Sequence, residues 1–321
     1  MIIRWVMFFL VLLVGWVQAA DAPYIRFARF RGDARAAVSL TFDDALPSHL
    51  NKAVPILNRY GLHATFFIFT DNVKTDATWE RWGEVARAGH ELGSHSKSHP
   101  PLSELNNPRR IRIEINGSAE TIKAKTGVRP ISFAYPFSDV DDIIRRRVRD
   151  AYFVDRDSCR IWGGAGFKAA AAIANIEQAV DRGEWFFCMM HGVDDKSFKA
   201  VPSAELEKIA RYLADKRPDI WTASYGQVAL YKTASRLAEL KFRDVRDDGF
   251  SLRLKIPAGT PYKEYMKQPL TLKISCIGHD GERIKAYCGD DYLVSAAARD
   301  NRYILLDVIP DGRWVDVYWL K

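Results

Sequence analysis

Two adjacent carboxylates follow an apolar segment near the start of the chain. The segment 36–42 reads AAVSLTF, and Asp43 and Asp44 come directly after it. A single Asp in this place is most often a turn former or a helix N-cap. Two in succession repel each other unless a cation or a proton lies between them. The pair therefore indicates a cation site as well as the simpler turn.

Histidines supply the other candidate ligands. His95 and His99 lie four residues apart in SHSKSHPP, and they can face the same way if this segment makes one helical turn. Neutral imidazole is the commonest metal ligand. Two histidines and one carboxylate, with an open position, are typical of a catalytic zinc site. A third histidine, His191, ends the apolar segment EWFFCMMH and precedes a glycine. The cysteines show no CxxC spacing and are not expected to bind metal.

These residues fall where apolar segments end. From residue 36 to about 240, such segments alternate with amphipathic stretches that often end in Gly or Pro. The alternation predicts βαβ units and a parallel sheet whose strands end at one mouth. Seven strands favour a barrel over a short open sheet, and we expect them at 36–42, 63–69, 89–95, 130–137, 151–157, 184–191 and 219–224.

A second texture begins near residue 240. Short strand-like segments such as FSLRLKI and YILLDVI are separated by turn formers such as DDG and PDG. This pattern predicts a small all-β, sandwich-like domain. We expect an α/β barrel domain over 20–240 and a C-terminal β domain over 241–321.

The first nineteen residues predict export. They contain Arg4, an apolar run over 5–17 and the ending VQA, which fits a signal-peptide cleavage site. Thirteen apolar residues are fewer than the roughly 20 that span a bilayer. A cleaved secretory signal over 1–19 is expected, with an uncleaved anchor as the alternative. The mature protein would then be secreted or periplasmic, without stable membrane insertion.

Composition and charge limit the other classes. The chain has 321 residues, is 48% hydrophobic and 27% charged, and carries a net charge of +7. This excludes a disordered chain, a collagen-like repeat and a disulfide-dense mini-protein. Export and a metal site make nucleic acid an unexpected partner, which leaves an acidic polymer or plain solvent for the surplus charge. The arginines over 145–149 are either a solvated helix face or a contact for such a polymer.

An oxidising compartment also allows disulfides. Two pairs are candidates, Cys276 with Cys288 and Cys159 with Cys188.

Four ordered motifs resemble those of the polysaccharide deacetylases, the NodB-homology group or carbohydrate esterase family 4. They are TFDD, HSKSH, FAYPF and MMH, within a resemblance that extends over about 36–235. The family resemblance implies a distorted (β/α)7 barrel. It also implies a divalent metal, usually zinc, and hydrolysis of N-acetyl or sometimes O-acetyl groups on sugars.

The resemblance assigns roles to five residues of this chain. Asp44, His95 and His99 match the metal ligands of the family. Asp43 matches its general base, and His191 matches its general acid.

One motif departs from the family. Ala134 stands where an Arg usually orients the base, and we expect either Arg156 or Arg160 to supply that charge from elsewhere. Asp157 is expected to orient the acid histidine. The expected substrate-binding residues are Tyr135, whose N–H would face the oxyanion, Phe137 and Met189, which replaces a family Leu. Trp162 either forms a wall of the acetyl pocket or packs in the core.

Together these features predict a secreted, metal-dependent hydrolase that deacetylates a glycan. One alternative is a carbohydrate-binding protein that kept the fold without turnover, and the missing motif Arg is its only support. Another is an amidase that acts on a non-sugar C–N bond. The sequence identifies neither the glycan nor an oligomeric state.

Overall fold

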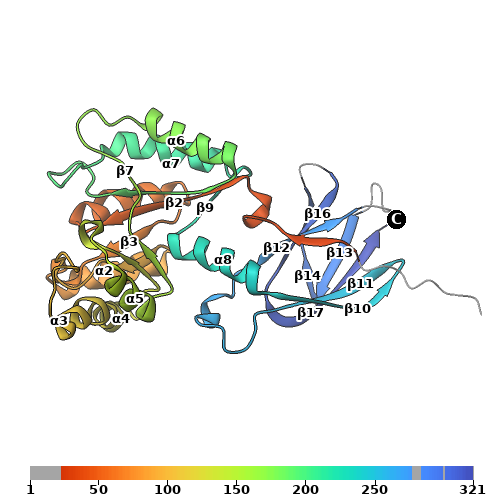
Figure 1. The fold of residues 1–321 in the computed structure, drawn as a ribbon. Helices are drawn as coiled ribbons and strands as arrows, with labels where there is room; N and C mark the ends of the chain where they lie inside the picture. Colours follow the sequence, from red (N-terminus) through yellow and green to blue (C-terminus); the bar gives the residue numbers. More distant parts are fainter. Residues whose placement is uncertain (1–22, 277–282, 299–300, 321) are drawn as a thin grey trace, which may run out of the picture.

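A computed structural model describes residues 23–276, 283–298 and 301–320, and it divides into an α/β part and an all-β part (Figure 1). The predicted signal segment, 1–19, lies outside the described residues. Within the described ranges, no helix is long and apolar enough to cross a membrane.

The α/β part is built on one parallel sheet. Its strand order is β6-β5-β4-β3-β2-β8-β7, and β9 pairs with the beginning of β2. The sheet stays open between β6 and β7, so it forms a half-barrel, a distorted (β/α)7 fold. All seven predicted strands are confirmed, and the short β7 was not predicted. The strands are β2 (Ala36–Asp43), β3 (Thr65–Ile68), β4 (Glu91–Ser94), β5 (Ser132–Ala134), β6 (Val154–Arg156), β7 (Arg160–Ile161), β8 (Trp185–Met190) and β9 (Ile220–Thr222).

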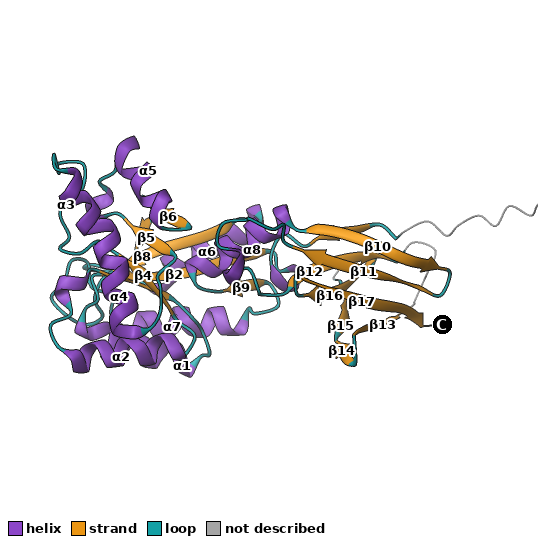
Figure 2. Ribbon diagram, turned by 90° about the horizontal axis from the view of Figure 1, so that it is seen from below, coloured by secondary structure: helices purple, strands orange, loops and turns teal. Residues whose placement is uncertain are grey.

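Helices cover the outside of this sheet (Figure 2). Several begin at side-chain caps; for example, Asp141 accepts a hydrogen bond from the Ile144 amide at the start of α5. The helices are η2 (His49–Ala53), α1 (Val54–Arg59), α2 (Asp76–Arg87), α3 (Pro108–Arg112), η4 (Ile113–Gly117), α4 (Ser118–Thr126), α5 (Asp142–Ala151), α6 (Ala169–Arg182), α7 (Ser203–Asp215) and α8 (Tyr225–Leu237).

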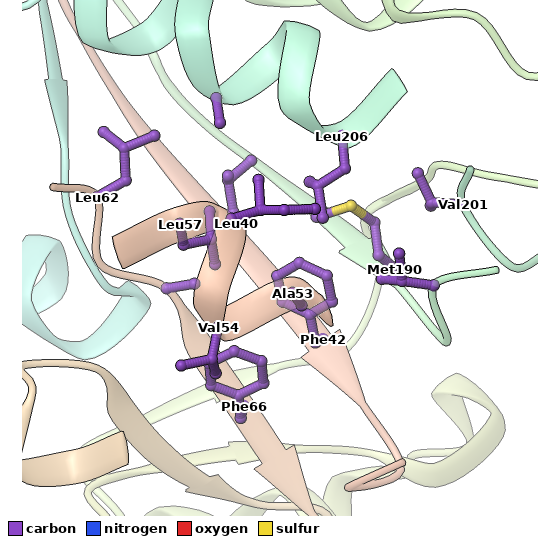
Figure 3. Close-up of a cluster of buried hydrophobic side chains, with 14 of the residues drawn as sticks. Leu40, Phe42, Ala53, Val54, Leu57, Leu62, Phe66, Met190, Val201 and Leu206 are labelled. Atoms are coloured by element: carbon purple, nitrogen blue, oxygen red, sulfur yellow. The ribbon is translucent and has the colours of Figure 1, made fainter. Parts of the chain in front are cut away.

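Strand β2 packs one face in the hydrophobic core and turns the other face to the inside of the half-barrel. Side chains alternate between the two faces of a strand. Leu40 and Phe42 pack in the hydrophobic cluster under α1 and α7, beside Leu57 and Leu206 (Figure 3). Thr41 and Asp43 therefore point to the other face, into the half-barrel. The last residue of the strand thus brings a carboxylate to the mouth from inside.

The all-β part is a sandwich of two antiparallel sheets. One has the order β1-β12-β16-β15, and the other β10-β11-β17-β13-β14. Its strands are β1 (Ile25–Phe27), β10 (Glu239–Arg246), β11 (Gly249–Lys255), β12 (Leu270–Ser275), β13 (Arg283–Cys288), β14 (Asp291–Leu293), β15 (Ser295–Ala297), β16 (Tyr303–Val308) and β17 (Asp311–Leu320).

Strand β1 belongs to this sandwich although it precedes the barrel in sequence. Ile25 lies opposite Ile274 of β12, and Phe27 lies opposite Leu272. Helix α8 also links the two parts. Its Tyr231 packs in the sandwich core and donates a hydrogen bond to the carbonyl of Ala28.

Neither candidate cysteine pair is linked in the structure. Cys159, Cys188 and Cys288 are free thiols. Cys188 is fully buried in the core of the half-barrel, whereas Cys288 packs in the core of the sandwich.

The buried side chain of His90 is expected to make the unfolding free energy fall at acidic pH. The Ala64 amide donates to its Nδ1 and Asn58 Oδ1 accepts from its Nε2, so the ring is neutral. Burial lowers its pKa from 6.5 to about 4. The unfolded chain therefore binds the proton first, and stability falls as pH drops from 6.5 towards 4. For this residue the loss is at most about 3 kcal/mol.

We expect urea unfolding of the wild type at pH 7 and pH 5 to show a larger loss of unfolding free energy than the same measurement on His90→Gln. His49 is also buried, with its pKa lowered to about 4 by burial, and it contributes equally to both proteins. Equal losses in the two proteins would contradict the prediction.

Candidate metal and catalytic site

A pocket of about 500 Å³ opens at the mouth of the half-barrel, where β2, β4, β5, β7 and β8 end. Its walls combine carboxylates and imidazoles with apolar side chains. The lining residues are Asp43, Asp44, His95, His99, Tyr135, Phe137, Ser138, Ile161, Met189, His191 and Phe198.

Three of these side chains have the spacing of a metal site. Asp44 Oδ1 lies 3.7 Å from His95 Nε2 and 3.5 Å from His99 Nε2. The two Nε2 atoms are 3.1 Å apart. Ligand atoms about 2.0–2.1 Å from a tetrahedral zinc ion are separated by about 3.4 Å. The three predicted ligands therefore fit a single ion of this kind.

The protonation states also suit a cation. His95 Nδ1–H donates to the carbonyl of Ala134 at 2.8 Å, which directs the Nε2 lone pair towards Asp44. Burial lowers the pKa of His95 to about 4, so the ring is neutral near pH 7. Asp44 Oδ1 is buried and has no hydrogen-bond partner among the described residues. Burial, followed by the charge of Asp43, raises the pKa of Asp44 to about 6, a strain that a bound cation would relieve.

A strained loop, rather than the expected helical turn, brings the two histidines together. Ser96 and His99 have positive φ angles of 65° and 62°, and the His99 amide donates to Ser96 Oγ. Asp44 is also left-handed, with φ of 82°. Such backbone strain in non-glycine residues is common at functional sites.

Glu114 of η4 holds this loop through hydrogen bonds, a role that the sequence did not indicate. Its buried carboxylate accepts hydrogen bonds from the amides of Lys97 and Ser98 and from Ser98 Oγ. Glu114 lies 16 residues away in sequence from the nearest of these partners, so no local pattern could connect it to the loop.

Arg156 provides the charge that the third motif lacks. Its Nη2 donates to Asp43 Oδ2, and its Nη1 donates to Thr41 Oγ1 at 3.1 Å. The guanidinium is fully enclosed and lies over the ring of Phe67. Arg160, the other candidate, is exposed on β7.

The contact with Arg156 keeps Asp43 ionised. Burial alone would raise the pKa of this carboxyl, but the charge and hydrogen bond of Arg156, with help from His95, bring the pKa below its ordinary value. Asp43 Oδ1 is buried and has no hydrogen-bond partner among the described residues. One carboxylate oxygen is thus anchored, and the other is free to accept a proton.

His191 follows β8 and faces the same pocket. Its Nε2 lies 3.9 Å from Asp44 Oδ2, and its carbonyl accepts a hydrogen bond from His49 Nε2 at 2.9 Å. Its Nδ1 is buried without a hydrogen-bond partner among the described residues. Asp157 does not orient it as predicted, because Arg145 and Ser158 hold the Asp157 carboxylate instead.

The turn after His191 requires a glycine. A Cβ on Gly192 would lie 2.0 Å from Asp195 Oδ2. Asp195 in turn accepts from Ser48 Oγ and Ser197 Oγ, and Ser197 Oγ accepts from the Gly192 amide. This network fixes the backbone that carries His191.

The apolar walls agree only partly with expectation. Tyr135, Phe137 and Met189 line the pocket as predicted, together with Ile161 and Phe198, which were not predicted. Phe137 packs edge-on against His99 and Phe198 against His191, with centroid distances of 4.6 and 5.3 Å. Both phenylalanines are largely exposed, at 68% and 60%.

Two expectations for the walls are wrong. Trp162 is buried against Phe167 and Phe186 in the core, because Ile161 takes the pocket side of β7 and the next residue faces away. The amide of Tyr135 donates to the carbonyl of Arg156 at 3.2 Å, so it is not free to bind an oxyanion.

Residues 31–154 match the family model for polysaccharide deacetylases. This region includes Asp43, Asp44, His95 and His99. This part of the chain is similar to the polysaccharide deacetylases. The family match ends before β8, so it includes neither His191 nor Phe198.

Curated relatives share this domain within longer proteins. A peptidoglycan-N-acetylmuramic acid deacetylase of Bacillus subtilis is 31% identical over 113 residues, which are 35% of this chain and 24% of that protein. A gellan lyase of Bacillus sp. is 25% identical over 209 residues, 65% of this chain and 8% of that protein. The chain thus spans about a quarter or less of these relatives.

A solved structure supports the fold. A protein from Mycobacterium smegmatis assigned as a polysaccharide deacetylase superposes with a TM-score of 0.55 at 16% identity. The match covers 68% of this chain and 96% of that one. The half-barrel and its helices therefore have the same fold as that protein.

Proposed function

We propose that this protein is an exported, metal-dependent hydrolase that removes acetyl groups, N-acetyl above all, from a glycan. One observation carries the proposal: a metal-type triad, an ionised carboxylate anchored by Arg156 and a histidine all face one pocket. The match of residues 31–154 to the polysaccharide deacetylase family model supports it. Arg156 also removes the one observation that favoured a non-catalytic carbohydrate-binding protein.

Asp44, His95 and His99 would hold the ion, and zinc suits this donor set best. A bound zinc ion would polarise the acetyl carbonyl and favour ionisation of the attacking water.

The remaining steps belong to the side chains of this protein. Asp43 accepts a proton at Oδ1 from the water that attacks the acetyl carbon, while Arg156 holds Oδ2 and keeps the carboxylate ionised. His191 then donates a proton to the leaving nitrogen as its bond to the acetyl carbon breaks. The products are acetate and a free amino sugar.

The walls suit an acetylated sugar. Ile161 and Met189 offer an apolar surface to the acetyl methyl group, and Met in place of Leu conserves volume. The exposed rings of Phe137 and Phe198 flank the opening, where sugar rings stack on aromatic faces. Relatives named as peptidoglycan and chitin deacetylases make a polymer of N-acetylated amino sugars the first substrate to try.

Acetate release and metal content, measured on the same sample, test the proposal. The panel contains chito-oligosaccharides, peptidoglycan and O-acetylated xylan. We expect about one zinc ion per chain, acetate from at least one glycan, loss of activity with a chelator and recovery with zinc. A protein that binds zinc and releases no acetate from any of them would contradict the enzyme proposal. Cleavage of a simple non-sugar amide in preference to glycans would favour an amidase.

A further inference from the structure

A basic groove lies between helices α3 and η4 on one side and α5 on the other. It has a volume of about 570 Å³ and shares no lining residue with the metal pocket. Figure 1 shows α3, α4 and α5 grouped on one side of the half-barrel. We call it the α3–α5 groove and define it by Arg109, Ile111, Arg112, Ile115, Asn116 and Arg147.

The three arginines of the groove are available to a ligand. Arg109, Arg112 and Arg147 are exposed, and none has a side-chain ion pair with another described residue. Two other arginines of α5 behave differently. Arg145 and Arg149 bind the carboxylate of Asp155 at 3.1 and 3.2 Å. Arg145 and Arg149 therefore bind α5 to β6, whereas Arg147 lines the groove.

The charge of the groove selects an anion. Three guanidinium groups face one carboxylate, that of Asp150, which gives a local surplus of two positive charges. The planar guanidinium matches carboxylate and phosphate groups with paired hydrogen bonds.

The rest of the lining selects a glycan rather than a nucleic acid. Ile111 and Ile115 form an apolar floor, and Asn116 offers an amide to hydroxyl groups. No aromatic side chain is among the lining residues, whereas single-stranded nucleic acids bind on aromatic stacking platforms.

We propose that the α3–α5 groove binds the carboxylate or phosphate groups of an acidic glycan, apart from the site of hydrolysis. The choice of a glycan rests on the proposed function. Along the sequence, α5 begins five residues after Phe137, a residue of the metal pocket. Such a groove would hold an acidic polymer at a second site on the half-barrel.

Binding of a galacturonate hexamer to the full chain, measured by calorimetry, tests this proposal. The hexamer carries no acetyl group, so the result is independent of turnover. We expect Arg112→Gln and Arg147→Gln each to weaken binding by about five- to tenfold, since each removes a charged hydrogen-bonding group. Acetate release from a neutral chito-oligosaccharide should be unchanged in both variants.

Neighbouring residues supply matched controls. Arg110 and Arg146 lie on the same helices but do not line the groove, so Arg110→Gln and Arg146→Gln remove the same charge elsewhere. We expect these variants to bind within about twofold of the wild type, because exposed single charges act weakly at physiological salt. A loss as large as that of the groove variants would show that overall charge alone attracts the glycan and would overturn the proposal.

Parallel probes distinguish the sources of the anion. Tighter binding of galacturonate than of poly(glycerol phosphate) assigns the groove to carboxylates, and the reverse order assigns it to phosphates. Either result supports the proposal if the groove variants lose it. Absence of binding to both probes, or tighter binding of a single-stranded DNA oligonucleotide than of either, would overturn it.

Discussion

Asp43→Asn is expected to lower the rate of acetate release by ~10²–10⁴-fold, the usual contribution of a general base. The amide can still accept a hydrogen bond from Arg156, but it cannot take a proton from water. Zinc binding should persist, because Asp44, His95 and His99 form the ligand set. The measurement is acetate release on the best substrate of the panel, with metal content determined on the same protein.

Two further variants make this prediction specific. Asp44→Asn should lose both the metal and the activity, because it alters a ligand. Asp157→Asn should keep both, because its carboxylate is bound to Arg145 away from the pocket. An Asp43→Asn protein that is folded by circular dichroism and retains more than a tenth of the activity would refute the role of Asp43 as the base.

Arg156→Gln should change both stability and the pH profile. The substitution leaves Asp43 buried without its cation, and breaking a buried pair in this way costs about 3–5 kcal/mol of unfolding free energy. The pKa of Asp43 then rises, since burial is no longer opposed by the guanidinium. The acid limb of kcat should therefore move to higher pH, so that more activity is lost at pH 6 than at pH 8.

Arg160→Gln is the matched control for this prediction. It removes the same charge from an exposed position four residues further along the chain, and it should change neither the unfolding free energy nor the acid limb. A stable Arg156→Gln protein with an unshifted pH profile would show that Arg156 does not position the base. The double variant Asp43→Asn with Arg156→Met should recover stability, because no charge is then left unpaired, without recovering activity.

The sequence predicted the parts of the fold and site that depend on local pattern. Apolar strand segments alternating with amphipathic helices predicted the parallel sheet and its mouth. The polar residues that end β2, β4 and β8 could then be placed together, because parallel strands end on one side. Asp43, Asp44, His95 and His191 follow from this rule.

Features set by tertiary packing could not be predicted in the same way. Arg156 and Arg160 both lie near the ends of short strands, and only the burial of β6 beside β5 distinguishes them. Trp162 was misplaced because the strand β7, and hence the face of each residue on it, was not foreseen. Glu114 lies in the π-helical turn η4 and bonds to a loop 16 residues before it in the sequence.

The pairing of β1 with β12 has a consequence for how the chain is made. During synthesis Ile25–Phe27 emerges early, but the strand that it pairs with emerges some 245 residues later. The first sheet of the sandwich therefore cannot be completed until the half-barrel has been translated. Because non-local pairing of this kind is slow, we expect the half-barrel to fold first. Strand β1 stays unpaired until β12 has been synthesised. The sandwich is then completed by segments from both ends of a folded half-barrel.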